Sequence, residues 1–192
     1  MARTEIRVAG FGGQGVILSG YIFGKAASLF DEKFATLIQS FGPEARGSAC
    51  SAQVIVSDEL IDYPYIRKPD IMVAISQEAF SKYSHDLKPN GILLTEEDMV
   101  TVSDDIASMY DHYTVPATRI ADQLGRRIVM NMVVVGCFTA VTGLLKKDAV
   151  MKAIEDSIPK GTEELNLKAF EKGYEHGLEL IKQRKEQVEE KA

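Results

Sequence analysis

Glycines gather close to the amino terminus in the segment Gly10–Gly15, which reads GFGGQG. Three of them have the spacing G-x-G-x-x-G between a strand-like run and a helix-like run. Glycines permit a tight turn in which backbone N–H groups approach a phosphate, and the start of the following helix favours negative charge. The segment therefore predicts a loop that contacts an anion such as a diphosphate. The residues that we expect to contact it are Gly10, Gly12, Gly13, Gln14 and Gly15.

Two other interpretations of these glycines stay open. Glycine would also be needed at these positions if its only role were to let a helix pack closely on a strand. Alternatively, the spacing is found in NAD(P)- or FAD-dependent oxidoreductases, which carry an acid at the carboxyl end of the second strand to hold the ribose. That end is Gln39-Ser40 here, and the nearest acids, Asp31 and Glu32, precede the strand. The missing acid weakens the dinucleotide interpretation.

A second polar loop, residues 40–48, reads SFGPEARGS and follows the second predicted strand, 34–39. The carboxyl ends of parallel strands meet at one edge of a sheet, so this loop should lie near the glycines. The guanidinium of Arg46 would suit a phosphate or a carboxylate, unless it only pairs with Glu44. Asn131, in an apolar run, would bind a ligand or satisfy a buried carbonyl. The further candidate contacts are Ser40, Gly42, Arg46 and Asn131.

Strand-like and helix-like runs alternate along the rest of the chain. They predict an α/β fold, a single-domain three-layer α/β/α architecture with an open, mostly parallel Rossmann-like sheet and extra C-terminal helices. We expect one domain over residues 1–181 and a charged C-terminal tail over 182–192 that frays. The predicted strands are 6–9, 34–39, 50–57, 70–75, 92–95 and 113–115, and the main helices begin near 16, 77, 116, 128, 148 and 163.

Composition argues against several classes of protein. The chain has 22 Lys and Arg against 28 Asp and Glu, a net charge of −6, which disfavours nucleic acid and anionic membranes as partners. It begins without an apolar signal segment and reads as cytoplasmic. Cys50 and Cys137 lie far apart, so we expect neither a zinc site nor an iron–sulfur cluster. No nucleophile–base constellation stands out in the sequence, and the positions of His85, His112 and His176 are typical of surface or packing residues. We therefore expect no catalytic residue and no metal ligand.

Taken together, the two loops identify a family. The sequence resembles the gamma subunits of 2-oxoacid:ferredoxin oxidoreductases, most closely those of the 2-oxoglutarate enzymes. The resemblance rests on GFGGQG at Gly10–Gly15, on QSFGPEARG at 39–47, on Asp62-Tyr63-Pro64 with SQEA at 76–79, and on Asn131-Met132. It extends from Ile6 to about Leu145 in the family's order.

The resemblance implies a function for the complex rather than for the chain alone. Enzymes of this kind decarboxylate a 2-oxoacid on thiamine diphosphate, pass electrons through iron–sulfur clusters to ferredoxin and transfer the acyl group to coenzyme A. Thiamine diphosphate and the clusters would lie in the alpha and beta subunits, with or without a ferredoxin-like delta subunit. This chain would contribute to the coenzyme A site and to assembly, and would be inactive alone.

The resemblance leaves two points open. It favours 2-oxoglutarate as the substrate over pyruvate, branched-chain 2-oxoacids and indolepyruvate. The chain could also be a structural scaffold whose glycine loop touches no ligand, or an independent NAD(P)- or FAD-binding oxidoreductase.

Overall fold

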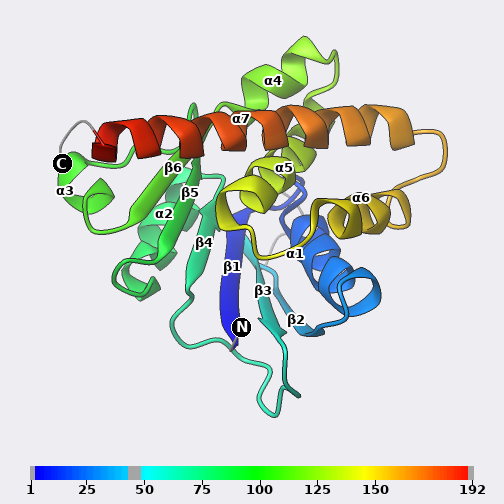
Figure 1. Cartoon of the computed structure of the whole chain (residues 1–192), viewed down its shortest axis with the longest axis horizontal. Helices are drawn as coiled ribbons and strands as arrows, with labels where there is room; N and C mark the ends of the chain where they lie inside the picture. The colour runs from blue at the N-terminus through cyan, green and yellow to red at the C-terminus, as the bar shows by residue number, and fades with distance from the viewer. Residues whose placement is uncertain (1–2, 43–48, 190–192) are drawn as a thin grey trace.

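The computed structural model describes residues 3–42 and 49–189. Its centre is a six-stranded sheet with the strand order β2-β3-β1-β4-β5-β6 (Figure 1). The strands are β1 (Thr4–Phe11), β2 (Phe34–Ser40), β3 (Ala49–Ser57), β4 (Ile71–Ala74), β5 (Ile92–Glu96) and β6 (Asp111–Val115).

Five of the six strands point the same way. β1, β4, β5 and β6 pair in parallel, whereas β3 is antiparallel to both of its neighbours, β1 and β2. The expected open, mostly parallel sheet is therefore confirmed. The exception is a β2–β3 hairpin, which places β3 between β1 and β2, so the second strand of the chain does not lie beside the first.

Helices cover both faces of the sheet. They are α1 (Val16–Lys25), α2 (Gln77–Tyr83), α3 (Asp104–Ala107), α4 (Ala117–Gln123), α5 (Met130–Thr142), α6 (Lys147–Glu155) and α7 (Glu163–Glu189). A π-helical turn, Ala26–Phe30, extends α1, and short 3₁₀ turns follow α2 and precede α5. α2 packs on one face of the sheet, and α1 and α5 pack on the other.

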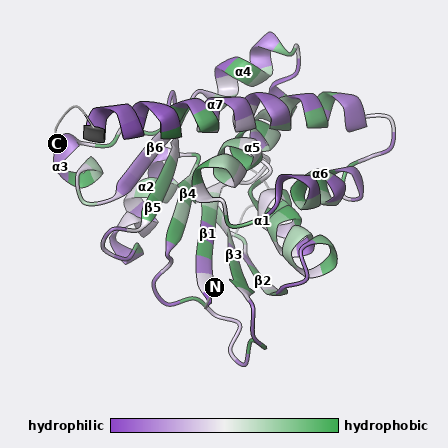
Figure 2. Ribbon diagram, in the orientation of Figure 1, coloured by the Kyte–Doolittle hydropathy of each residue, from purple (hydrophilic) through white to green (hydrophobic). Residues whose placement is uncertain are grey.

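Alternation along the strands explains this three-layer arrangement, because successive side chains point to opposite faces. On β4, Ile71 and Val73 join the larger core beneath α1 and α5, while Met72 and Ala74 join the smaller core beneath α2. Hydrophobic residues accordingly concentrate on the central strands and on α5 (Figure 2).

α7 packs extensively against α5 and runs across the strands (Figure 1). Glycines let the two backbones touch: a Cβ on Gly173 would lie 1.9 Å from the carbonyl oxygen of Val133, and one on Gly136 would lie 2.0 Å from that of Phe170. α7 remains helical to Glu189, so the expectation that residues 182–189 fray is wrong. Arg184 holds this end of the helix because it pairs with Asp111 and lies over the ring of Tyr113. No helix in 3–42 or 49–189 is long and apolar enough to cross a membrane.

Candidate anion site at the glycine loop

The predicted glycine loop joins β1 to α1. β1 ends at Phe11 and α1 begins at Val16. Gly13 has a φ of 97° and Gly15, the residue that caps α1, has a φ of 75°. These left-handed conformations strain any residue with a side chain, which is the physical reason for glycine at both positions.

The amide of Gln14 fixes the shape of this loop instead of facing outward. Its Oε1 accepts a hydrogen bond from the N–H of Phe11 at 2.7 Å, and its Nε2 donates to the carbonyl of Ile75 at 3.1 Å. Nε2 also lies 3.4 Å from the sulfur of Met99. The side chain thus ties the loop to Ile75, directly after β4, and to Met99, in the turn after β5.

Several backbone N–H groups of the loop have no backbone acceptor within residues 3–42 and 49–189. The N–H groups of Gly12, Gly13 and Gly15 donate to no backbone carbonyl among the described residues. α1 has no side-chain cap, and no acidic residue lies in its first turn. The positive end of the helix dipole and these N–H groups therefore favour an anion at this point.

Asn131 lies directly against the loop from the first turn of α5. A Cβ on Gly15 would lie 2.4 Å from its Nδ2, so the two residues are in close contact. Asn131 is only 4% exposed, and no side-chain hydrogen bond joins its amide to another of the described residues. In the described part of the chain, the fully buried side-chain atoms without a partner are Arg7 Nε, Thr36 Oγ1 and Thr118 Oγ1. The amide of Asn131 is not among them, so it still reaches solvent beside Gly15. It is therefore a polar group that a ligand at the loop could contact.

The second predicted loop begins at the same edge of the sheet. Ser40, the last residue of β2, pairs with Ser51 of β3, which pairs in turn with Ala9 near the end of β1. Ser40 is exposed there, and Gly42 follows it. Arg46 lies outside the described residues, so its predicted phosphate contact stays a prediction.

Gly10 has a different role from the other loop glycines. It lies inside β1 and is buried, and a Cβ there would lie 2.5 Å from Cγ1 of Ile75 and 3.0 Å from Cγ2 of Val16. Close packing alone explains this glycine, as one of the two alternative interpretations of the motif anticipates.

The acids nearest to the second strand serve the fold. Asp31 is buried, its carboxylate pairs with Nζ of Lys146 at 2.8 Å, and it accepts from the backbone N–H of the same lysine. Glu32 has a φ of 54° in the turn before β2. Neither acid reaches the edge that carries the glycine loop, so neither takes the place of a ribose-binding carboxylate.

Sequence reasoning missed Glu96 at the end of β5. Its side chain is fully buried; Oε2 accepts from the N–H of Asp98 at 2.8 Å, and Oε1 accepts from that of Thr118 at 2.9 Å. Nearby, a hydrogen bond to Glu97 raises the pKa of Arg119. The only signal in the sequence was an acid directly after an apolar strand. Glu96 fixes the start of α4 at the edge that carries the glycine loop.

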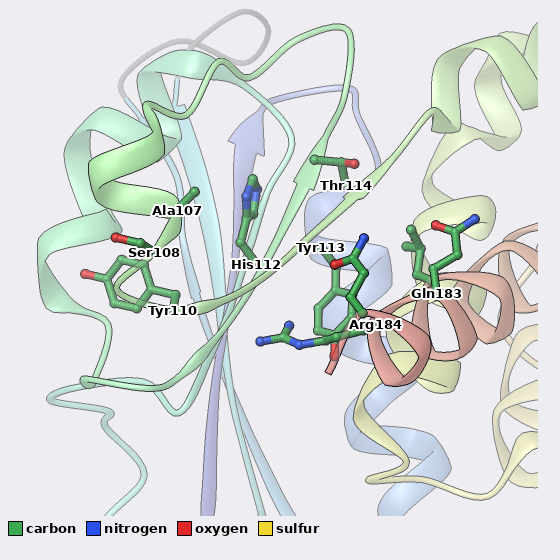
Figure 3. Close-up of a pocket in the computed structure, with 10 residues that line it drawn as sticks. Ala107, Ser108, Tyr110, His112, Tyr113, Thr114, Gln183 and Arg184 are labelled. Carbon is green, nitrogen blue, oxygen red and sulfur yellow. The ribbon is translucent and has the colours of Figure 1, made fainter. Parts of the chain in front are cut away.

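A pocket of about 530 Å³ opens elsewhere, between β6, α3 and the end of α7 (Figure 3). Tyr110 and Ser108 line one side, and Gln183 and Arg184 line the other. Its charged and titratable groups are already engaged: Arg184 pairs with Asp111, and Nε2 of His112 lies 2.9 Å from Oγ1 of Thr95. It contains none of the predicted site residues.

The thiols are buried in the fold. Burial raises the pKa of the Cys137 thiol to about 12 and also raises that of Cys50. Across the described residues, His, Cys, Asp and Glu form no group of three or more that could hold a metal ion.

Comparisons with known proteins identify the fold and the family. The profile of the pyruvate ferredoxin/flavodoxin oxidoreductase family matches residues 5–176. The chain belongs to this family. It is 50% identical to the 2-oxoglutarate synthase subunit KorC of Methanocaldococcus jannaschii over 179 residues, which cover 93% of this chain and 96% of the relative. It is 36% identical to the pyruvate synthase subunit PorC of the same organism, with coverage of 91% and 97%.

The solved structures agree with this assignment. The keto/oxoacid ferredoxin oxidoreductase gamma subunit of Geobacter sulfurreducens is 40% identical, with a TM-score of 0.83 over 93% of this chain and 98% of that chain. The resemblance to gamma subunits that the two loops carried is therefore confirmed, and this chain is a gamma-type subunit of an oxidoreductase complex.

Proposed function

We propose that this chain completes the coenzyme A site of a multi-subunit 2-oxoglutarate:ferredoxin oxidoreductase and helps to assemble that complex. In the reaction, a 2-oxoacid is oxidatively decarboxylated, its acyl group passes to coenzyme A and its electrons pass to ferredoxin. The glycine loop and Asn131 would bind the diphosphate of coenzyme A. They would hold the cofactor's thiol end toward the subunits in which the acyl group forms.

The observation that carries this proposal is the set of unpaired donors in and beside the glycine loop. The glycine loop has unpaired N–H groups, it leads into the uncapped start of α1, and the amide of Asn131 lies against its last glycine. A diphosphate presents several acceptor oxygens with negative charge, which this arrangement complements. We place the guanidinium of Arg46 at the same diphosphate, on the strength of its position after Ser40 and Gly42.

The identities favour 2-oxoglutarate as the oxoacid. One organism has both a 2-oxoglutarate synthase subunit and a pyruvate synthase subunit of this type, and the chain is 50% identical to the former and 36% to the latter. For the redox chemistry, the two thiols are buried and separate. This supports placing the iron–sulfur clusters in the partner subunits, where we place thiamine diphosphate as well.

The dinucleotide interpretation has less support. The described end of β2 presents Gln39 and Ser40 where a ribose-binding acid would be needed, and β3 lies between β1 and β2. The purely structural interpretation leaves the unpaired donors and the unbonded amide of Asn131 without a purpose.

The proposal is tested by Asn131→Asp in the reconstituted complex. The change keeps the shape of the side chain and adds a negative charge against the diphosphate, so we expect kcat/KM for coenzyme A to fall at least tenfold. The KM for 2-oxoglutarate should change less than twofold. Gln183→Glu, the same amide-to-acid change on α7, is the control. Equal losses for coenzyme A and 2-oxoglutarate in an intact complex would overturn the placement.

A further inference from the structure

The connection between β3 and β4, residues 58–70, carries large hydrophobic side chains that the fold leaves in solvent. Leu60 is 73% exposed, and Tyr63 and Tyr65 are each 52% exposed. The connection lies below the strands in Figure 1, at the end of the sheet opposite the glycine loop. β1 alone separates the two ends by roughly 25 Å, from about 3.3 Å per strand residue. This loop therefore serves something other than the anion site.

The loop is held in shape although it has no regular secondary structure. Glu5 of β1 pairs through Oε1 with Arg3 at 3.0 Å and accepts through Oε2 from the N–H of Arg67 at 3.3 Å. Nη2 of Arg3 in turn donates to the carbonyl of Tyr65 at 3.2 Å. Ile66 is buried, and its N–H lies 3.4 Å from Oε1 of Gln53.

This combination is typical of a docking element. Long connections without secondary structure are uncommon in compact domains and usually functional. Tyrosines in exposed, ordered positions supply much of the binding energy at protein interfaces, and preorganisation lowers the entropy lost on binding. The rings of Tyr63 and Tyr65 lie 5.5 Å apart, so they present one continuous aromatic surface.

Charge narrows the choice of partner. The residues between Ser57 and Ile66 that are charged at neutral pH all carry carboxylates, and those of Glu59 and Asp62 are exposed. Neither of these two makes an ion pair within the described chain. A second copy of the same loop, or an anionic bilayer, would bring like charges together. Arg67 and Lys68 follow only where the chain returns to the sheet.

We infer that residues 59–65, the tyrosine loop, dock into an apolar pocket rimmed by Lys or Arg on another subunit of the oxidoreductase complex. The inference rests on the chain being a subunit of such a complex. It goes beyond the coenzyme A site, because the loop lies at the opposite end of the sheet.

The test measures assembly of the native complex. A preparation of the complex from which this chain has been removed is titrated with the purified chain, and binding is followed by recovery of 2-oxoglutarate-dependent dye reduction and by size-exclusion chromatography. We expect Leu60→Ser and Tyr63→Ala each to raise the Kd at least tenfold. Glu59→Lys should raise it as well, with a weaker dependence on salt. Leu178→Ser, which removes an exposed leucine from α7, is the matched control and should stay within twofold.

The possible outcomes separate the claims. The loop variants should keep the wild-type melting temperature, because their side chains are exposed. If the wild-type chain restores activity and all loop variants bind as tightly as wild type, the docking inference is wrong and the proposed function stands. If the wild-type chain restores no 2-oxoglutarate-dependent dye reduction, the proposed function is wrong. Loss of self-association in the variants by sedimentation, or loss of binding to phosphatidylglycerol vesicles, with subunit assembly unchanged, would also overturn the inference.

Discussion

Substituting Gly13 by alanine separates a ligand role of the glycine loop from a structural one. Gly13 is exposed, has a φ of 97°, and a Cβ there would meet nothing within 4 Å. Gly161, in the turn before α7, has a φ of 85° and equally open surroundings. The left-handed backbone costs each alanine variant about 1–2 kcal/mol. At about 2–4 °C per kcal/mol for a chain of this size, both melting temperatures should fall by about 2–8 °C.

Only the Gly13 variant should change the use of coenzyme A. In the proposed site its methyl group would stand where backbone N–H groups bind phosphate oxygens, and losing one such charge-assisted hydrogen bond costs about 1.5–3 kcal/mol. Because about 1.4 kcal/mol is a factor of ten, kcat/KM for coenzyme A should fall about ten- to a hundredfold. The assay is steady-state dye reduction by the reconstituted complex with coenzyme A varied at saturating 2-oxoglutarate. If Gly13→Ala and Gly161→Ala give the same kcat/KM, the loop binds no phosphate.

The fold makes three further predictions. Gly173→Ala should destabilise the chain by about 1–3 kcal/mol because the methyl group would overlap the backbone of α5. Gly24→Ala, in open surroundings within α1, should stabilise it by about 0.5–1 kcal/mol. Thermal melts of the two variants should therefore shift in opposite directions. Cys50 and Cys137 should not react with Ellman's reagent at pH 8 in the native chain and should both react after unfolding, so rapid native labelling would contradict their burial. Burial lowers the pKa of His112 below its ordinary 6.5, so the unfolded chain binds more protons than the folded chain below that pH. The free energy of unfolding should therefore fall as the pH drops from about 7 to 5. Thermal melts of the His112→Gln variant should show a smaller loss of stability over the same range.

Much of the sheet could be predicted from local pattern. Apolar runs such as 70–75 and the glycine-rich turn after β1 depend on neighbouring residues, and both were located correctly. The position of β3 could not be predicted in this way, because a hairpin and a helical crossover differ in contacts between distant strands. The charged end of α7 was misjudged for the same reason: its helix is stabilised by the contact of Arg184 with Asp111 and Tyr113, residues far away in the sequence.

At the candidate site, too, local sequence predicts some features, and others depend on contacts between distant residues. The spacing of the glycines located the loop, but spacing alone does not distinguish Gly10, which packs against Ile75, from Gly13, which faces solvent. Gln14 has a side chain that could contact a ligand, but its amide is hydrogen-bonded to the backbones of Phe11 and Ile75 because β4 lies beside β1. Asn131 was identified as a polar residue in an apolar run, and only the fold brings it against Gly15.

Hydrogen exchange in the assembled native complex tests the central claim most directly. Amide exchange of residues 12–17 is measured with no ligand, with coenzyme A and with 2-oxoglutarate. If the loop holds the diphosphate, coenzyme A should slow exchange at Gly12, Gly13 and Gly15, and 2-oxoglutarate alone should leave it unchanged. Unchanged exchange at saturating coenzyme A, in a complex that still forms acyl-CoA, would contradict the account.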